Sequence, residues 1–179
     1  MAFEKPTQLF FVRHGQTDWN VQGKLQGRQD IPLNHQGRLE AKELASRLKK
    51  GFDICFSSPS RRAQETALII TEASIPIYLE NKLLERDFGP WEGRSRREYQ
   101  EDLEKKFVET DEAMQSRVFE CLEQLFQLHK GKTILVVSHG GVLRNILKEI
   151  APDAPEDVPN CGCFLLSRIQ ESFLFEGWL

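Results

Sequence analysis

The sequence has no long hydrophobic run and no recognisable export signal. Its first apolar run extends only from Leu9 to Val12, and no stretch approaches the roughly 18 apolar residues that a membrane-spanning helix needs. The N-terminus lacks the basic region and the long apolar region of a secretory signal peptide. We therefore expect a cytoplasmic protein that does not contact a membrane.

Cysteine is scarce. The four cysteines, Cys55, Cys121, Cys161 and Cys163, lie mostly inside apolar segments, which is not typical of a disulfide framework. We expect reduced thiols in the core. The pair in Cys161-Gly162-Cys163 is not a Cys-x-x-Cys motif and has no histidine cluster nearby, so we expect no metal ion and no cofactor.

The chain also has little excess charge. Its net charge of −3 and pI near 5.9 exclude a broad positive field that would attract nucleic acid or anionic lipid, so an anionic ligand would need a local site. A hydrophobic content of 40% and a charged content of 28% are typical of a globular protein. The length of 179 residues predicts one domain over residues 1–179 and does not indicate an oligomeric state.

Short apolar runs alternate with amphipathic segments. Because Pro76 cannot donate to a β-ladder, we expect the third run to lie near a sheet edge. The predicted strands are Gln8–Val12, Asp53–Ser57, Ile75–Leu79 and Thr133–Val137, with a terminal hairpin of Cys163–Leu166 and Phe173–Phe175.

Helical spacing of apolar residues predicts the intervening elements. The first helix begins after the N-cap Asn34, the second opens at Ser58-Pro59, and two more cover Met114–His129 and about Val142–Ile150. We expect an α/β fold with three layers, α/β/α, in which a mostly parallel sheet has helices on both faces. Residues from about 94 to 130 are expected to form a short helical insert over the site.

Polar residues follow four of the apolar runs. Since the carboxyl ends of parallel strands meet at one edge of a sheet, these residues should converge there. Their imidazole, guanidinium and carboxylate groups are those needed to hold a phosphate, attack it and protonate the leaving oxygen. The four segments are Arg13-His14, Ser57 to Arg62, Glu85-Arg86 and Ser138-His139.

Each of these residues also has a structural interpretation. A single histidine beside a strand is more often a structural hydrogen-bonding group, but His14 and His139 both end strongly apolar strands and both precede glycine. Arg61 and Arg62 lie at a helix start, where the helix dipole disfavours cations, so they are either solvated or bind an anion. The structural interpretation of Glu85 is a surface ion pair with a neighbouring basic residue.

The two remaining histidines have no such context. His35 lies at a helix start and His129 in the last turn of a helix, and we assign both to the surface.

Four motifs in the chain resemble those of the histidine phosphatase superfamily, also called phosphoglycerate mutase-like. The resemblance covers nearly the whole sequence, and the motifs follow the family order. They are Arg13-His14-Gly15 with a downstream Asn20, Ser57 to Ala67 aligned so that Arg62 rather than Arg61 is the phosphate ligand, Leu84-Glu85-Arg86 to Gly93, and Ser138-His139-Gly140-Gly141.

The resemblance implies a mechanism without metal. It implies that His14 becomes phosphorylated and that Glu85 protonates the leaving group and then activates water. It also implies that His139 acts with these two as a catalytic residue. The implied phosphate-binding residues are Arg13, Arg62, Asn20 and Gly140.

The family contains both phosphatases and mutases. The short insert, the end at Leu179 and the Phe88 to Gly93 segment favour a phosphomonoesterase that acts on a small phosphorylated metabolite, near the α-ribazole phosphatases. A cofactor-dependent phosphoglycerate mutase and a non-catalytic phospholigand-binding module are the alternatives. The substrate itself cannot be predicted, because the insert and the loop after Asn20 contain no motif that indicates it.

Overall fold

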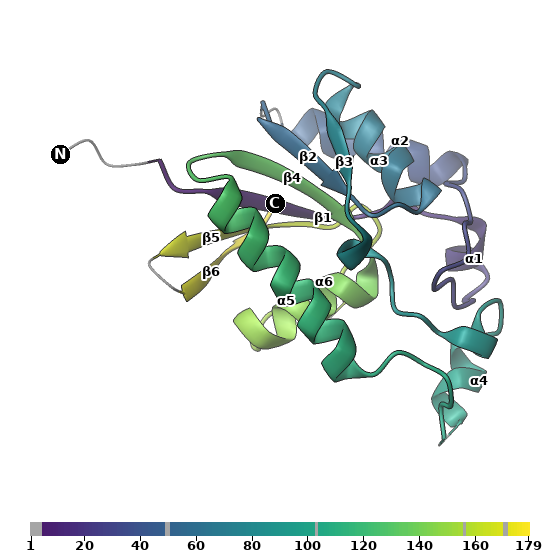
Figure 1. Ribbon diagram of the computed structural model, residues 1–179. Helices are drawn as coiled ribbons and strands as arrows, with labels where there is room; N and C mark the ends of the chain where they lie inside the picture. The colour runs from purple at the N-terminus through teal and green to yellow at the C-terminus, as the bar shows by residue number, and fades with distance from the viewer. Residues whose placement is uncertain (1–4, 49–50, 103, 156, 170–171) are drawn as a thin grey trace.

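The centre of the molecule is a six-stranded mixed sheet with the strand order β3-β2-β4-β1-β5-β6. The computed structural model describes residues 5–48, 51–102, 104–155, 157–169 and 172–179 (Figure 1). Strands β3, β2, β4 and β1 run parallel, and β5 and β6 form an antiparallel hairpin on β1. The strands are β1 (Gln8–Arg13), β2 (Ile54–Ser57), β3 (Ile77–Leu79), β4 (Thr133–Ser138), β5 (Cys163–Ile169) and β6 (Ser172–Trp178).

Helices cover both faces of this sheet, which confirms the predicted three-layer fold. Helices α2 (His35–Leu48) and α3 (Arg61–Thr71) pack on one face, and α5 (Asp111–Leu128) and α6 (Gly140–Ile150) pack on the other (Figure 1). Successive strand residues point to opposite faces, so Phe10 and Phe11 enter separate apolar cores, both fully buried. The hydrophobic effect thereby fixes the register of the central strands.

Strand boundaries agree with the sequence predictions to within a few residues. The predicted hairpin is present, β3 is an edge strand, and all six residues of β4 are buried. The side-chain oxygen of Asn34 accepts a hydrogen bond from the backbone N–H of Gly37 at 2.9 Å, which confirms the predicted N-cap of α2.

Helix α3 begins later than the sequence predicted. Its first residue is Arg61 and its N-cap is Ser60, so Ser58 and Pro59 belong to the turn after β2 rather than to the helix. Ser58 is thereby left at the carboxyl end of a strand. The backbone N–H of Ser58 donates to the carbonyl of Val137 at 2.9 Å, which continues the pairing of β2 with β4.

The segment expected to cover the site is shorter than residues 94–130. Met114, Val118 and Leu122 of α5 are buried in the core against the sheet, so α5 belongs to the main body. The short helices α1 (Asp18–Val21) and α4 (Arg96–Glu101) instead lie beyond the carboxyl ends of the parallel strands (Figure 1). Two 3₁₀ turns, η1 (Asn81–Leu83) and η2 (Gly89–Trp91), complete the described elements.

The four cysteines are free thiols, and all four are buried, as predicted. His35 is exposed, but His129 is only half exposed because its ring packs against Phe56 with 5.3 Å between ring centroids. Among the described helices, none is long and apolar enough to cross a membrane.

Candidate active site

The register of the central strands brings the predicted site residues together. Arg13 of β1 pairs with Ser138 of β4, so His14 and His139, the next residues of each strand, leave the sheet side by side. Their rings lie 5.2 Å apart between centroids, in an edge-to-face arrangement. The two imidazoles that the sequence placed at separate strand ends therefore lie at one point.

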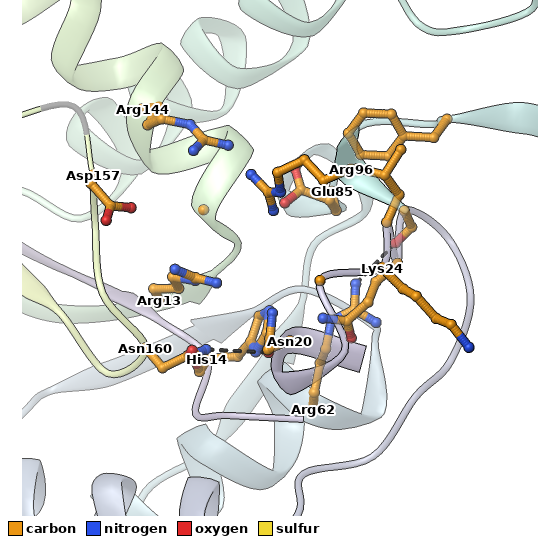
Figure 2. A pocket seen from close by; sticks show the side chains of 16 residues that line it. Arg13, His14, Asn20, Lys24, Arg62, Glu85, Arg96, Arg144, Asp157 and Asn160 are labelled. Carbon is orange, nitrogen blue, oxygen red and sulfur yellow. Dashed lines mark hydrogen bonds between the residues drawn. The ribbon is translucent and has the colours of Figure 1, made fainter. Parts of the chain in front are cut away.

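A cavity of about 260 Å³ opens at this edge of the sheet. Figure 2 shows its labelled side chains around a central space, with Arg144 and Asp157 on one side and Lys24 on the other. It is lined by six predicted site residues, Arg13, His14, Asn20, Arg62, Glu85 and Gly140, together with Gly23, Lys24, Leu25, Gln26, Gly27, Phe88, Arg96, Arg144, Asp157 and Asn160.

His14 is held in one tautomer. Its Nδ1 lies 2.7 Å from the carbonyl oxygen of Gly15. Because that oxygen can only accept a hydrogen bond, Nδ1 carries the proton and Nε2 keeps its lone pair. Burial, followed by repulsion from Arg62 and Arg13, holds the pKa of His14 well below 6.5, so the ring is neutral at pH 7.

The loop that carries His14 is fixed by close backbone packing. Its Gly15 lies against Gly37 of α2, and a Cβ on Gly15 would come within 2.4 Å of the Gly37 carbonyl oxygen. The Gly15 N–H donates to the hydroxyl oxygen of Thr66 on α3 at 3.1 Å. Gly15 and Thr66 therefore hold the His14 loop against α2 and α3.

Two guanidiniums flank His14, that of Arg62 wholly buried and that of Arg13 half-buried. Arg62 is 0% exposed, and burial lowers its pKa to about 10; burial also lowers the pKa of Arg13. The Nη atoms of Arg62 donate to the carbonyls of Gln29 and Gly27 at 2.7 and 2.9 Å. Arg61, by contrast, is exposed, so the alignment that selected Arg62 agrees with the side chain that lines the cavity.

Several nitrogens at this edge have unused hydrogen-bonding capacity. In the part of the chain that the structure describes, Nε of Arg13, Nε of Arg62 and Nδ1 of His139 are buried without a partner. Buried polar groups normally have partners because an unsatisfied one costs about 1–3 kcal/mol. Of these, the Nε atoms of Arg13 and Arg62 belong to residues that line the cavity, and such N–H donors are suited to an anion with several acceptor oxygens.

Glu85 faces the cavity from the segment after η1. Its Oε2 accepts from the N–H of Gly141 at 3.1 Å and its Oε1 from the N–H of Arg86 at 2.8 Å. A Cβ on Gly141 would lie 2.2 Å from Oε1, so only glycine allows this approach to the start of α6. The alternative ion pair between Glu85 and Lys82 or Arg86 is absent from the described salt bridges, in which these bases pair with Glu120 and Asp111.

His139 lies behind His14 and does not itself line the cavity. It is 0% exposed, and its Nε2 lies 2.7 Å from the hydroxyl oxygen of Ser58. Burial, then repulsion from Arg62 and His14, holds its pKa well below 6.5. It is therefore a second neutral imidazole at this edge.

Asn20 and Gly140 border the cavity from two helices. Asn20 belongs to α1, and a capping box between Thr17 and Asn20 stabilises the N-terminus of that helix. Gly140 begins α6, and a Cβ there would approach Nε of Arg13 to 3.3 Å. The first N–H groups of a helix favour a negative charge, which suits the position of Gly140.

Several lining residues were not found from the sequence. Lys24, Asp157 and Asn160 come from loops, and Arg96 and Arg144 from helices α4 and α6, all without a strand-end signal. The cavity lining therefore contains five cationic side chains, Arg13, Arg62, Lys24, Arg96 and Arg144, and two carboxylates, Glu85 and Asp157. Among the described salt bridges, none involves any of these five cations.

Within the described residues, no group of three or more His, Cys, Asp or Glu side chains is arranged to hold a metal ion.

Comparison with known proteins gives a family match over almost the whole chain. The model of the histidine phosphatase superfamily (branch 1) matches residues 9–178. The chain is 38% identical to the uncharacterized phosphatase PhoE of Bacillus subtilis, over 84% of this chain and 80% of that protein. It is 35% identical to a metal-independent phosphoserine phosphatase of Arabidopsis thaliana, over 96% and 81% of the two chains.

Mutases are also among the relatives. A 2,3-bisphosphoglycerate-dependent phosphoglycerate mutase of Gloeobacter violaceus is 30% identical over 84% of this chain and 78% of its own.

Solved structures agree with these matches. A phosphoserine phosphatase mutant from Entamoeba histolytica, in complex with phosphoserine, superimposes with a TM-score of 0.87 at 27% identity, over 96% of each chain. A putative α-ribazole-5′-P phosphatase from Escherichia coli has a TM-score of 0.82 at 28% identity, over 96% of this chain and 95% of that chain.

Proposed function

This chain belongs to the histidine phosphatase superfamily and is a phosphatase, and we propose that it hydrolyses a small phosphomonoester through a phosphorylated His14, without a metal ion. The observation that carries the proposal is the state of the His14 ring. Its Nδ1–H is bound to the Gly15 carbonyl, and its lowered pKa keeps Nε2 unprotonated at neutral pH. An unprotonated nitrogen in a cationic cavity is a competent nucleophile for phosphorus.

In the first step, Nε2 of His14 attacks phosphorus. The N–P bond forms while the bond from phosphorus to the leaving alcohol oxygen breaks, and Glu85 in its protonated form gives that oxygen a proton. The residues proposed to hold the non-bridging oxygens are Arg13, Arg62, Asn20 and Gly140, and the two arginines balance the charge. His139 is proposed to act beside His14, whose ring it contacts.

In the second step, water attacks the phosphohistidine. Glu85, now a carboxylate, takes a proton from the water, the N–P bond breaks, and inorganic phosphate leaves. The position of Glu85 supports both uses, because its carboxylate lines the same cavity as His14.

The substrate proposed is a phosphomonoester with a second anionic group. Lys24, Arg96 and Arg144 line the cavity in addition to the two arginines assigned to the phosphate, and they take part in no ion pair among the described side chains. A hydrogen bond to a charged group contributes about 1.5–3 kcal/mol, which is enough to select such a substrate. The phosphoserine held by the Entamoeba relative carries a carboxylate of this kind.

The experiment compares release of inorganic phosphate from 3-phosphoglycerate, phosphoserine and glycerol 3-phosphate, with and without EDTA. Glycerol 3-phosphate has a hydroxymethyl group where 3-phosphoglycerate has its carboxylate, so it is the matched control. We expect hydrolysis that EDTA does not affect and a preference of about tenfold or more for the carboxylated substrates. No phosphate release from any ester, or loss of activity with EDTA, would refute the proposal.

Mutase relatives make phosphoglycerate mutase the second candidate. Its test is incubation with 3-phosphoglycerate and a catalytic amount of 2,3-bisphosphoglycerate. Efficient isomerisation without net phosphate release would establish a mutase in place of the hydrolase that we propose.

A further inference from the structure

The stretch from 157 to 162, which leads into β5, wraps the end of β1. The N–H of Cys161 donates to the carbonyl of Arg13 at 3.1 Å and to that of His14 at 3.4 Å, and the N–H of Arg13 donates to the carbonyl of Gly162 at 3.0 Å. Cys161 adopts a φ of 54°, which a residue with a Cβ rarely adopts. This strained backbone is held in place where it contacts the proposed nucleophile.

Asn160 adds a side-chain link to these backbone contacts. Its Nδ2 donates to the carbonyl of His14 at 3.0 Å and to Oδ1 of Asn20 at 3.4 Å. An amide nitrogen has two hydrogens, so one nitrogen serves both acceptors. Asn160 thus connects the loop of His14 to helix α1.

The amide of Asn20 has a defined orientation because of these contacts. Its Oδ1 also accepts from the N–H and the hydroxyl of Thr17, each at 3.0 Å. The Thr17 N–H can only donate, so the oxygen of Asn20 faces Thr17 and Asn160 and its NH₂ group faces elsewhere. Asn20 lines the cavity, and in the hydrogen bonds among the described residues its side chain acts only as an acceptor, through Oδ1.

We propose that Asn160 is a positioning residue, which fixes the His14 loop and the amide of Asn20 so that the Asn20 NH₂ group faces the phosphoryl group. The proposal rests on the proposed function, since it assigns Asn20 a phosphoryl oxygen as acceptor. It predicts that Asn160 acts mainly through Asn20. The backbone bonds of Cys161 and Gly162 do not depend on the Asn160 side chain, so its removal is expected to leave the end of β1 in place.

A double-mutant cycle tests this link. The kcat/KM for p-nitrophenyl phosphate and the inhibition constant of inorganic phosphate are measured for the wild type, N20A, N160A and the double variant. We expect N160A to lower kcat/KM about tenfold and to weaken phosphate inhibition, with melting temperature unchanged. The double variant should be no worse than N20A by more than about twofold, because coupled residues do not show additive effects.

An isosteric variant separates positioning from packing. Asn160→Asp keeps the size of the side chain but replaces the donor with a carboxylate that faces two oxygens, so we expect a loss at least as large as that of N160A. Asn81→Ala, at an exposed position outside the cavity, is the matched control and should behave as wild type. Wild-type rates in N160D, or losses that multiply in the double variant, would overturn the proposal.

Failure of the proposed function has a different signature. Hydrolysis by the wild type with no phosphate on His14 would contradict the covalent mechanism. Inhibition by inorganic phosphate needs no covalent intermediate, so the four inhibition constants would still decide the role of Asn160.

Discussion

Two arginines with opposite surroundings mark two regions of this protein. Arg117 on α5 forms a two-pronged contact with Glu109, with Nε to Oε1 at 2.6 Å and Nη2 to Oε2 at 2.8 Å, and Nη1 also donates to the carbonyls of Lys82 and Leu84. Arg62, at the start of α3, is wholly buried but contacts only carbonyl oxygens. Among the described residues, no carboxylate forms an ion pair with it.

The difference separates a structural cation from one available to a ligand. The charge of Arg117 is neutralised within the fold, and its contacts hold the segment that leads into Glu85. The charge of Arg62 is desolvated without an ion-pair partner among the described residues, and this desolvation lowers its pKa to about 10 and costs folding free energy. A protein retains such a cost where an anion binds, and Arg62 lines the cavity beside His14.

The largest expected effect comes from Arg62→Met. Because this removes a charge proposed to stabilise the transferring phosphoryl group, we expect kcat/KM for p-nitrophenyl phosphate to fall about 10²–10³-fold. The free energy of unfolding should change by less than about 2 kcal/mol, since the lost hydrogen bonds are offset by removal of a buried charge. Arg61→Met is the control and should keep wild-type activity; equal losses in both variants would remove the distinction between the two arginines.

Glu85 connects the two regions, since its carboxylate lies in the cavity and its preceding segment is held by Arg117. For Glu85→Gln we expect a loss of about 10²-fold with glycerol 3-phosphate, whose leaving alkoxide needs a proton, and only a few-fold loss with p-nitrophenyl phosphate. The exposed Glu43→Gln is the control. Equal losses with both esters would argue against Glu85 as the proton donor.

Arg117→Met should give the converse of Arg62→Met. It leaves Glu109 partly buried with only the more distant Arg28, at 3.9 Å, as a basic partner, and we expect the free energy of unfolding to fall by about 3 kcal/mol in urea titrations. Changing Glu109 to Gln in the same chain should recover part of this loss. A loss below about 1 kcal/mol for the single variant would show that the Arg117–Glu109 pair is not the structural element that its geometry indicates.

The smallest effect is a pH dependence of stability. The pKa values of His14 and His139 are held well below 6.5, so the unfolded chain takes up protons at these positions at a higher pH than the native chain. The free energy of unfolding should therefore fall as pH decreases from 6.5 to 5.5, by at most about 1.4 kcal/mol per unit for each histidine.

Arg62→Met should flatten this slope only in part, because burial is the main cause that lowers the pKa of both histidines and repulsion from Arg62 is the second. The exposed His35 is the control, and His35→Gln should leave the slope unchanged. Urea unfolding at several pH values provides the measurement. A stability that does not change over this range would contradict the neutral, buried state of the two rings.

The sequence predicted the sheet and its strand-end residues because both depend on local patterns. Short, β-branched apolar runs such as Thr133–Val137 are typical of buried strands, and parallel strands carry the residues that follow them to one edge. Distinguishing Arg62 from Arg61 required the family motif, because two adjacent arginines look alike in composition. The match to phosphatases also excludes the non-catalytic module as the main interpretation.

Most residues of the cavity wall could not be predicted from such local patterns. Asn160 lies in the proline-rich connection before β5, and its partners His14 and Asn20 are 146 and 140 positions away in the chain. Arg96 and Arg144 enter the cavity from two helices. In the helical pattern of the sequence, charged residues at these positions look like ordinary surface residues. Their meeting is a result of tertiary packing, which no local spacing encodes.

Trapping the phosphohistidine intermediate tests the covalent mechanism most directly. The wild type and His14→Asn are mixed briefly with a ³²P-labelled phosphomonoester, quenched in base and analysed for protein-bound phosphate that is labile to acid. We expect label on the peptide that contains His14 in the wild type and none in the variant. Rapid hydrolysis by the wild type with no label on His14, or an equally labelled His14→Asn, would contradict this mechanism.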